Sequence, residues 1–166
     1  MAKVYLDSND TFIVSSNNTT VYGTTGSEVV TIAAGVTGVT LDQGVERVVL
    51  GGASSAYTFQ QLGNQIQVYS NGVLVFSTPV QGDTNGTQLT FTDGTADAKL
   101  TTGVMTLGGA TVSSTAGAVT PTTIDTSVKS SASSAVAGQS FSLTTGTDTF
   151  VGTANNDTIT GTSATL

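Results

Sequence analysis

The stretch that decides the fold is residues 10–54, which divide into five nines: DTFIVSSNN, TTVYGTTGS, EVVTIAAGV, TGVTLDQGV and ERVVLGGAS. Three columns agree from one nine to the next. The third column is Phe12, Val21, Val30, Val39 and Val48, the fifth is Val14, Gly23, Ile32, Leu41 and Leu50, and the eighth is Asn17, Gly26, Gly35 and Gly44 before a break at Ala53. Two apolar columns two residues apart describe a short strand with one buried face. The Gly or Asn column marks a turn.

Each nine can bury its apolar pair only against the next nine, so the repeat predicts a stacked β-solenoid. The alternative is a β-meander whose strands happen to be evenly spaced. The period alone leaves open whether nine residues make half of a turn or another fraction of it.

After Gly51-Gly52 the period is lost, and alternating strands separated by turn signals follow. The predicted strands are 57–62, 65–69, 73–76, 88–91 and 104–107. The strongest hairpin signal is Asn71-Gly72, because a type I′ turn needs positive φ at both positions. We predict antiparallel strands that cap or flank the solenoid, giving one domain over residues 1–112.

The aromatic residues of this segment allow two interpretations. Tyr57, Phe59 and Tyr69 could form a stacking platform for a carbohydrate or another partner. Aromatic residues in alternating strands are more often core residues, and we favour that interpretation.

Residues 113–140 are dominated by Ser, Thr, Ala and Gly and show no strong period. This composition is typical of a linker, in which Ile124 and Val128 are the candidates for local docking.

The period of nine returns in the last segment, residues 141–166. Asp148 is followed by Asp157, Phe150 by Ile159, and Gly152 by Gly161. This stretch resembles the β-roll of the repeats-in-toxin family, whose nonapeptide is G-G-x-G-x-D-x-U-x with U apolar. The match has departures: Leu143 and Thr144 replace the glycine pair of one repeat, and Asn155 stands where the next repeat has a third glycine.

The resemblance implies a start of a calcium-binding β-roll. In that family the apolar residue fills the core, while carboxylates and turn carbonyls hold Ca²⁺ between turns. The positions that match are Gly146, Asp148, Gly152, Asn155 and Asp157. Only about two repeats precede Leu166, so we expect the chain to be a piece of a longer protein. The alternative is a Thr-rich tail without fixed structure.

The first nine has a similar phrase, since Asn9-Asp10-Thr11-Phe12 parallels Asn156-Asp157-Thr158-Ile159. Asp7 and Asp10 are therefore candidate calcium ligands at the start of the solenoid. The interpretation we favour is that they are turn residues whose side chains bond to the local backbone.

Composition excludes several function classes. Only 9% of residues are charged, the net charge is −7, and there is no Cys, His or Trp. Nucleic-acid binding needs clustered Lys and Arg, and the usual nucleophilic triads and Cys/His zinc sites need residues that are missing. We expect no enzyme activity, the one formal carboxylate pair being Asp93 with Asp97. No apolar run approaches a transmembrane length.

The phrases GTQLTFTDGT, TLGGATV and TGTDTFVGTANNDTITGT also resemble bacterial surface proteins secreted by the type I route, including adhesins and surface-layer proteins. The resemblance implies export without an N-terminal signal peptide and an extracellular location. It favours a structural module, part of a surface layer, filament or adhesin stalk, that self-associates or anchors to surface glycan. The main alternative is a carbohydrate-binding adhesion domain.

Overall fold

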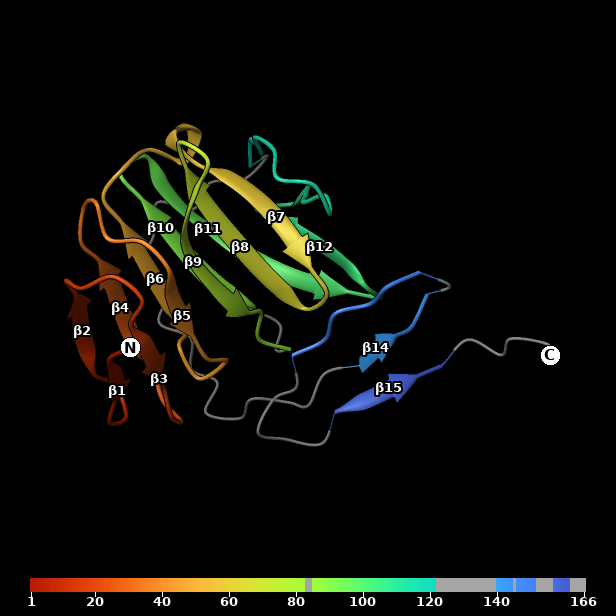
Figure 1. The fold of residues 1–166 in the computed structure, drawn as a ribbon, viewed down its shortest axis with the longest axis horizontal. Helices are drawn as coiled ribbons and strands as arrows, with labels where there is room; N and C mark the ends of the chain where they lie inside the picture. The colour runs from red at the N-terminus through yellow and green to blue at the C-terminus, as the bar shows by residue number, and fades with distance from the viewer. Residues whose placement is uncertain (83–84, 122–139, 145, 152–156, 162–166) are drawn as a thin grey trace.

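The computed structural model describes residues 1–82, 85–121, 140–144, 146–151 and 157–161. These residues form two large sheets and one small one (Figure 1). Sheet A has the order β1 (Lys3–Tyr5), β3 (Thr20–Tyr22), β5 (Val39–Leu41), β9 (Val73–Pro79), β8 (Gln65–Ser70), β7 (Thr58–Leu62). Sheet B has the order β13 (Ala110–Thr111), β12 (Val104–Leu107), β11 (Gly94–Thr101), β10 (Thr87–Phe91), β6 (Arg47–Leu50), β4 (Val29–Ile32), β2 (Thr11–Val14). The small sheet pairs β14 (Ser140–Ser142) with β15 (Thr158–Thr160).

The predicted β-solenoid is confirmed, and nine residues make half of a turn. Successive strands alternate between the two sheets, so each strand pairs in parallel with the strand one whole coil away. In sheet B, Phe12 pairs with Val30 and Val30 pairs with Val48, a constant spacing of 18 residues. The third and fifth columns of the repeat thus face the interior, where Val30, Val48 and Leu50 are buried.

Sheet A departs from the regular period. Val4 pairs with Val21 and Val21 pairs with Leu41, so the spacings there are 17 and then 20 residues. The even columns predicted Val39 opposite Val21, and the structure shifts this register by two positions. The loops between the strands differ in length while the inward-facing side chains stay apolar, so the burial pattern survives the shift.

The turn column is largely as expected. Gly26 and Gly35 have φ of 149° and 82°, which L side chains rarely adopt. In the first nine it is Asn18, next to the predicted Asn17, that has a positive φ of 56°.

The middle segment contains the predicted hairpins. Asn71 and Gly72, with φ of 50° and 77°, join β8 to β9 in the manner of a type I′ turn. The turn at Asp93-Gly94 joins β10 to β11. The sequence did not indicate β11, which is eight residues long and pairs with both β10 and β12.

These antiparallel strands extend the solenoid. β9 pairs in parallel with β5 and β10 pairs in parallel with β6, so both continue the coil stack. From β9 sheet A continues into β8 and β7, and from β10 sheet B continues into β11, β12 and β13. The buried apolar side chains of residues 6–112 form one cluster between the two sheets. One end of the molecule carries β1 and β2, and the other carries the hairpins (Figure 1).

The described start of the predicted linker lies along β7. The Phe59 N–H donates to the Gly117 carbonyl at 2.8 Å, the Gly117 N–H donates back at 3.0 Å, and the Gln61 N–H donates to the Ser113 carbonyl. Ile124 and Val128 lie outside the described residues. The boundaries at 112–113 and 140–141 stay predictions.

Candidate functional site

The last segment repeats the half-turn of the solenoid. Phe141 in β14 pairs with Ile159 in β15 in parallel, again 18 residues apart. Phe150, at the midpoint of that spacing, stacks on Phe141 with ring centroids 5.3 Å apart. The apolar positions of the predicted nonapeptide therefore lie together, as a β-roll start requires.

Of the predicted calcium ligands in this segment, Asp148 has the clearest geometry. Its two carboxylate oxygens accept from the Thr144 N–H at 2.8 Å and from the Thr144 hydroxyl at 2.9 Å. The Gly146 N–H donates to the same hydroxyl at 3.1 Å, which closes a tight turn. Asp157 is half-buried just before β15, while Gly152 and Asn155 lie outside the described residues. The calcium site stays a prediction.

Asp7 and Asp10, the candidate ligands at the N-terminal end, face each other across their own turn. The Asp7 N–H donates to Oδ2 of Asp10 at 2.9 Å, and the Asp10 N–H donates to the Asp7 carbonyl at 3.1 Å. These are the bonds of the turn interpretation. Within the described ranges, no group of three or more Asp or Glu side chains is placed to hold a metal ion.

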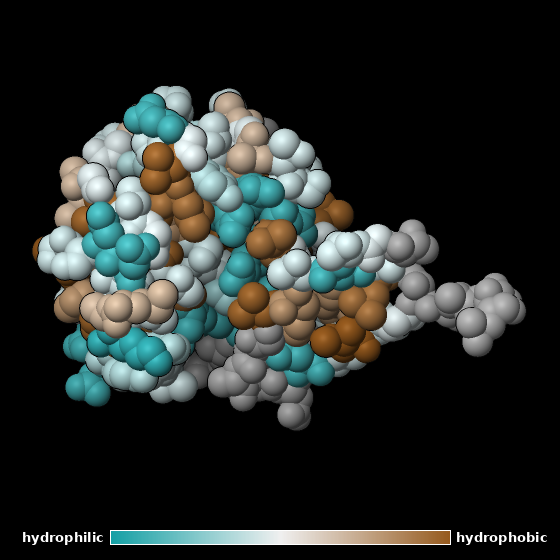
Figure 2. Space-filling view, in the orientation of Figure 1, coloured by the Kyte–Doolittle hydropathy of each residue, from teal (hydrophilic) through white to brown (hydrophobic). Residues whose placement is uncertain are grey.

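The C-terminal segment docks on the turn between β7 and β8. The Asn64 side-chain amide donates to the Val151 carbonyl and its oxygen accepts from the Val151 N–H at 3.2 Å. Gly63, with a φ of 60°, lies so close to Thr149 that any side chain at position 63 would meet the Thr149 carbonyl. The apolar side chains Leu143, Val151 and Ile159 remain exposed, and brown residues gather over this segment in Figure 2.

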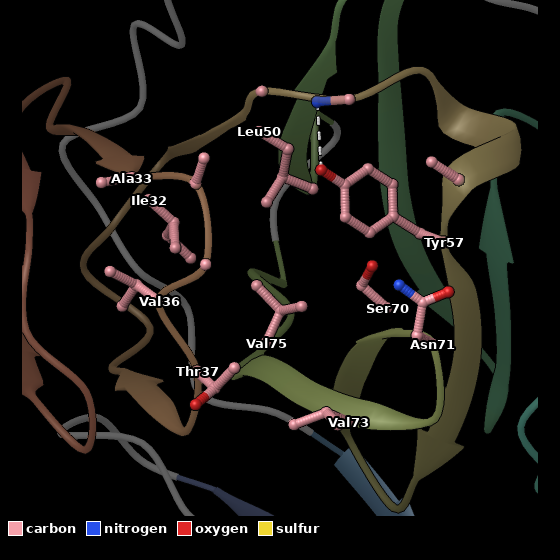
Figure 3. Close-up of a pocket in the computed structure, with 15 residues that line it drawn as sticks. Ile32, Ala33, Val36, Thr37, Leu50, Tyr57, Ser70, Asn71, Val73 and Val75 are labelled. Atoms are coloured by element: carbon pink, nitrogen blue, oxygen red, sulfur yellow. Dashed lines mark hydrogen bonds between the residues drawn. The ribbon is translucent and has the colours of Figure 1, made fainter.

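The platform of three aromatic residues does not form. Phe59 is fully buried, as the core interpretation predicted. The Tyr69 hydroxyl donates or accepts at Gln60 and Gln67, at 3.0 and 2.8 Å. Tyr57 instead lines an uncharged cavity of about 470 Å³ between the solenoid and the β8–β9 turn, where its hydroxyl accepts from the Gly52 N–H (Figure 3). Ile32, Leu50 and Val75 form aliphatic walls of the same cavity.

The formal carboxylate pair has structural partners. Asp93 accepts from the N–H and the hydroxyl of Ser54, both at 2.8 Å, and these bonds lower the pKa of Asp93. Asp97 lies 3.7 Å from the Lys99 ammonium and accepts from the Gln88 amide at 3.3 Å. Asp93 thus holds the loop at η1 (Ser54–Ala56) against the β10–β11 turn.

Sequence reasoning missed a buried pair of acids. Glu28 and Glu46 are 0% and 3% exposed, and each comes directly before a strand of sheet B, β4 and β6 respectively. The Glu28 N–H donates to Oε2 of Glu46 at 2.6 Å. A signal existed: these are the two glutamates of the whole sequence, and both open a nine, 18 residues apart.

A third acid lies near this pair. Oδ1 of Asp42 accepts from the Gly23 N–H at 2.8 Å and from the Gly44 N–H at 3.0 Å. Burial and the charge of Glu28 raise the pKa of Asp42, and the two backbone bonds oppose that shift. Asp42 thereby bridges two neighbouring coils.

The comparisons with known proteins identify no relative: no family model, curated protein or solved structure matches the chain. Among the described residues no helix is long and apolar enough to span a membrane.

Proposed function

We propose that the chain is an extracellular structural module that stacks end to end with further copies of itself, with Ca²⁺ ordering its C-terminal coil. The observation that carries the proposal is the uncovered coil at the N-terminal end. β1 and β2 are the last strands of their sheets, and the described residues pair nothing on their outer sides (Figure 1). An edge of this kind is a template for another strand.

The hydrogen bonds show which residues present this edge. The Val29 N–H donates to the Asp10 carbonyl and the Ala33 N–H donates to the Val14 carbonyl, so those carbonyls of the first coil face β4. Because backbone groups alternate along a strand, Thr11 and Ile13 direct their N–H and C=O outward. Ile13 is also 60% exposed and Tyr5, on β1, is 73% exposed.

The C-terminal coil offers a complementary end. It has the same 18-residue parallel pairing, and it exposes Leu143, Val151 and Ile159. A head-to-tail contact between the two ends does not close on itself and therefore produces filaments. Regular β-strands at both ends and an apolar surface at the second support this arrangement.

Replacing Ile13 with proline is expected to prevent assembly. Proline removes the N–H at the open edge and leaves the bonds between β2 and β4 in place. We expect wild-type particles to elongate in millimolar calcium in electron microscopy and sedimentation, and the variant to associate about tenfold more weakly or worse.

The matched control is Ile13→Thr, which removes the exposed apolar side chain but keeps the N–H and the β-branch, and should assemble. Assembly of Ile13→Pro at the wild-type level would remove the N-terminal edge from the proposal. A wild-type chain that stays monomeric with and without calcium, yet binds glycans on an array, would favour the carbohydrate-binding adhesion domain. In that case the cavity beside Tyr57 is the place to map the sugar.

Calcium is expected to order residues 141–166 through Asp148 and Asp157. Extracellular calcium modules have dissociation constants of about 0.1–1 mM, and we expect binding in that range by calorimetry. The double variant Asp148→Asn/Asp157→Asn should show no saturable binding there, because it loses two carboxylates. Asp93→Asn/Asp97→Asn removes the same charge elsewhere and should bind as the wild type does. Equal binding by both double variants would contradict the β-roll assignment.

A further inference from the structure

Two stacked glutamates in the core lack the counter-charge that buried acids need. The Glu28 carboxylate accepts at Oε1 from the Asn9 N–H at 3.2 Å and from the Thr24 hydroxyl at 3.1 Å. The Glu46 carboxylate accepts from the Glu28 N–H and, at Oε1, from the Gln81 side-chain amide at 3.1 Å. The remaining oxygen, Oε2 of Glu28, is buried without a hydrogen-bond partner in the structure.

The charged groups around the pair do not neutralise it. The guanidinium of Arg47, the residue after Glu46, donates twice to the Gln88 side-chain oxygen, at 3.0 and 2.6 Å. Asp42 acts on Glu28 with the same sign of charge, and Oδ2 of Asp10 is bonded to the Asp7 N–H. The other described partners, Asn9, Thr24 and Gln81, are neutral donors.

Two ionised carboxylates in a core are costly, and so is a buried acceptor without a donor. One proton between the two carboxyl groups removes one charge and supplies a donor at the same time.

We propose that Glu28 and Glu46 share one proton in the folded solenoid, so that neighbouring coils are joined by a carboxylic acid–carboxylate hydrogen bond that is lost in alkali. The bond would run along the coil axis, across a contact that every further coil of this type repeats. The stack is then most stable in acid and loosens as the pH rises.

The electrostatics of the site agree with this geometry. Burial, and then the hydrogen bond and charge of Glu28, raise the pKa of Glu46 from its ordinary 4.5 to about 8. Between these two pH values the folded chain holds a proton that the unfolded chain has released. The folding equilibrium constant therefore falls about tenfold for each pH unit in this window, and stability is complete below pH 4.5 as far as this pair is concerned.

The direct test uses the fact that the chain has only two glutamates. Selective ¹³C labelling of glutamate gives two carboxyl resonances in NMR, which we would follow from pH 4 to 10 with a calcium chelator present. We expect the pair to titrate in two separated steps, the later one near pH 8. If both resonances titrate together near the ordinary value, the shared proton does not exist.

The variant test compares Glu28→Gln with the wild type in urea unfolding across the same pH range. The new amide nitrogen takes the position of Oε2 and donates permanently to Glu46, while the amide oxygen keeps the bonds from Asn9 and Thr24. We expect the wild-type midpoint to fall from pH 5 to 8 and the Glu28→Gln midpoint to stay level, exceeding the wild type above neutral pH. Parallel curves would overturn the proposal.

Two further arms separate a shared proton from a bound cation and from a general loss of charge. Glu46→Gln also removes the pair, but its amide group meets either the Glu28 N–H or the Gln81 donor, so we expect it to be less stable than Glu28→Gln. If calcium or sodium stabilises the wild type at pH 8 to 9 and Glu28→Gln abolishes that effect, the pair holds a cation instead of a proton.

Discussion

Gly23→Ala is expected to destabilise the solenoid by about 3 kcal/mol, at the upper end of overpacking costs. A Cβ at position 23 would lie 2.2 Å from the Gly44 carbonyl oxygen and 2.3 Å from its carbon. Both atoms belong to the backbone of the next coil, so no side chain can rotate away. The coils must separate locally, which also disturbs the Asp42 bonds to the Gly23 and Gly44 N–H groups.

The control is Gly51→Ala, because a Cβ at position 51 meets nothing within 4 Å. Neither glycine has a positive φ, so the two substitutions differ in space and not in backbone preference. Chemical unfolding of both variants at one pH gives the comparison. We expect Gly51→Ala within about 0.5 kcal/mol of the wild type, as for an open surface position. Equal midpoints for the two variants would mean that the coils do not approach as closely as the structure places them.

The coil stack around Gly23 shows where the sequence was sufficient and where it was not. The columns at Phe12, Val30 and Val48 predicted both the buried face and the stacking in sheet B. In sheet A the period suggested Val39 opposite Val21, and the register instead matches Leu41. Hydrophobic alternation identifies the face of a strand, but a shift of two keeps the same face inward, so it cannot be detected from the pattern.

Local signals explain the hairpins in the same way. Asn71-Gly72 requires its turn through backbone preference, and the sequence is enough to place it. β11 has no such signal, because Ala96, Asp97, Ala98 and Lys99 are poor strand formers. It forms since β10 and β12 pair with both of its sides, and the small side chains of Ala96 and Ala98 fit beneath its neighbours in the core.

The candidate site was predictable only in part. The period of nine in the C-terminal segment predicted the alignment of Phe141, Phe150 and Ile159, which the structure contains. Glu28 and Glu46 were missed because glutamate in the first column of an amphipathic repeat usually indicates a solvated corner. Only the packing of β9, β10 and the segment carrying Gln81 covers that corner and makes the pair a buried one.

Phe59→Ala is expected to cost about 4 kcal/mol, the range for a large aromatic residue removed from a core. Phe59 lies on β7, at the far end of sheet A, and is fully buried. Its ring meets Phe91 of sheet B edge to face, with centroids 6.0 Å apart. Its backbone also holds Gly117 on both sides of one bridge. The substitution therefore loosens the two sheets and the segment that follows them.

Since small domains are stable by only about 5–15 kcal/mol, a loss of this size should shift the whole unfolding transition. Tyr5→Ala is the control: Tyr5 is 73% exposed and contacts Tyr22 by stacking at 4.9 Å, so we expect about 1 kcal/mol. Urea unfolding followed by circular dichroism and by tyrosine fluorescence separates the outcomes. A single shifted transition means that the hairpins and the coils share one core. Two transitions, with the first alone sensitive to Phe59→Ala, would instead make the β7–β8 hairpin an independent unit on a solenoid that is stable without it.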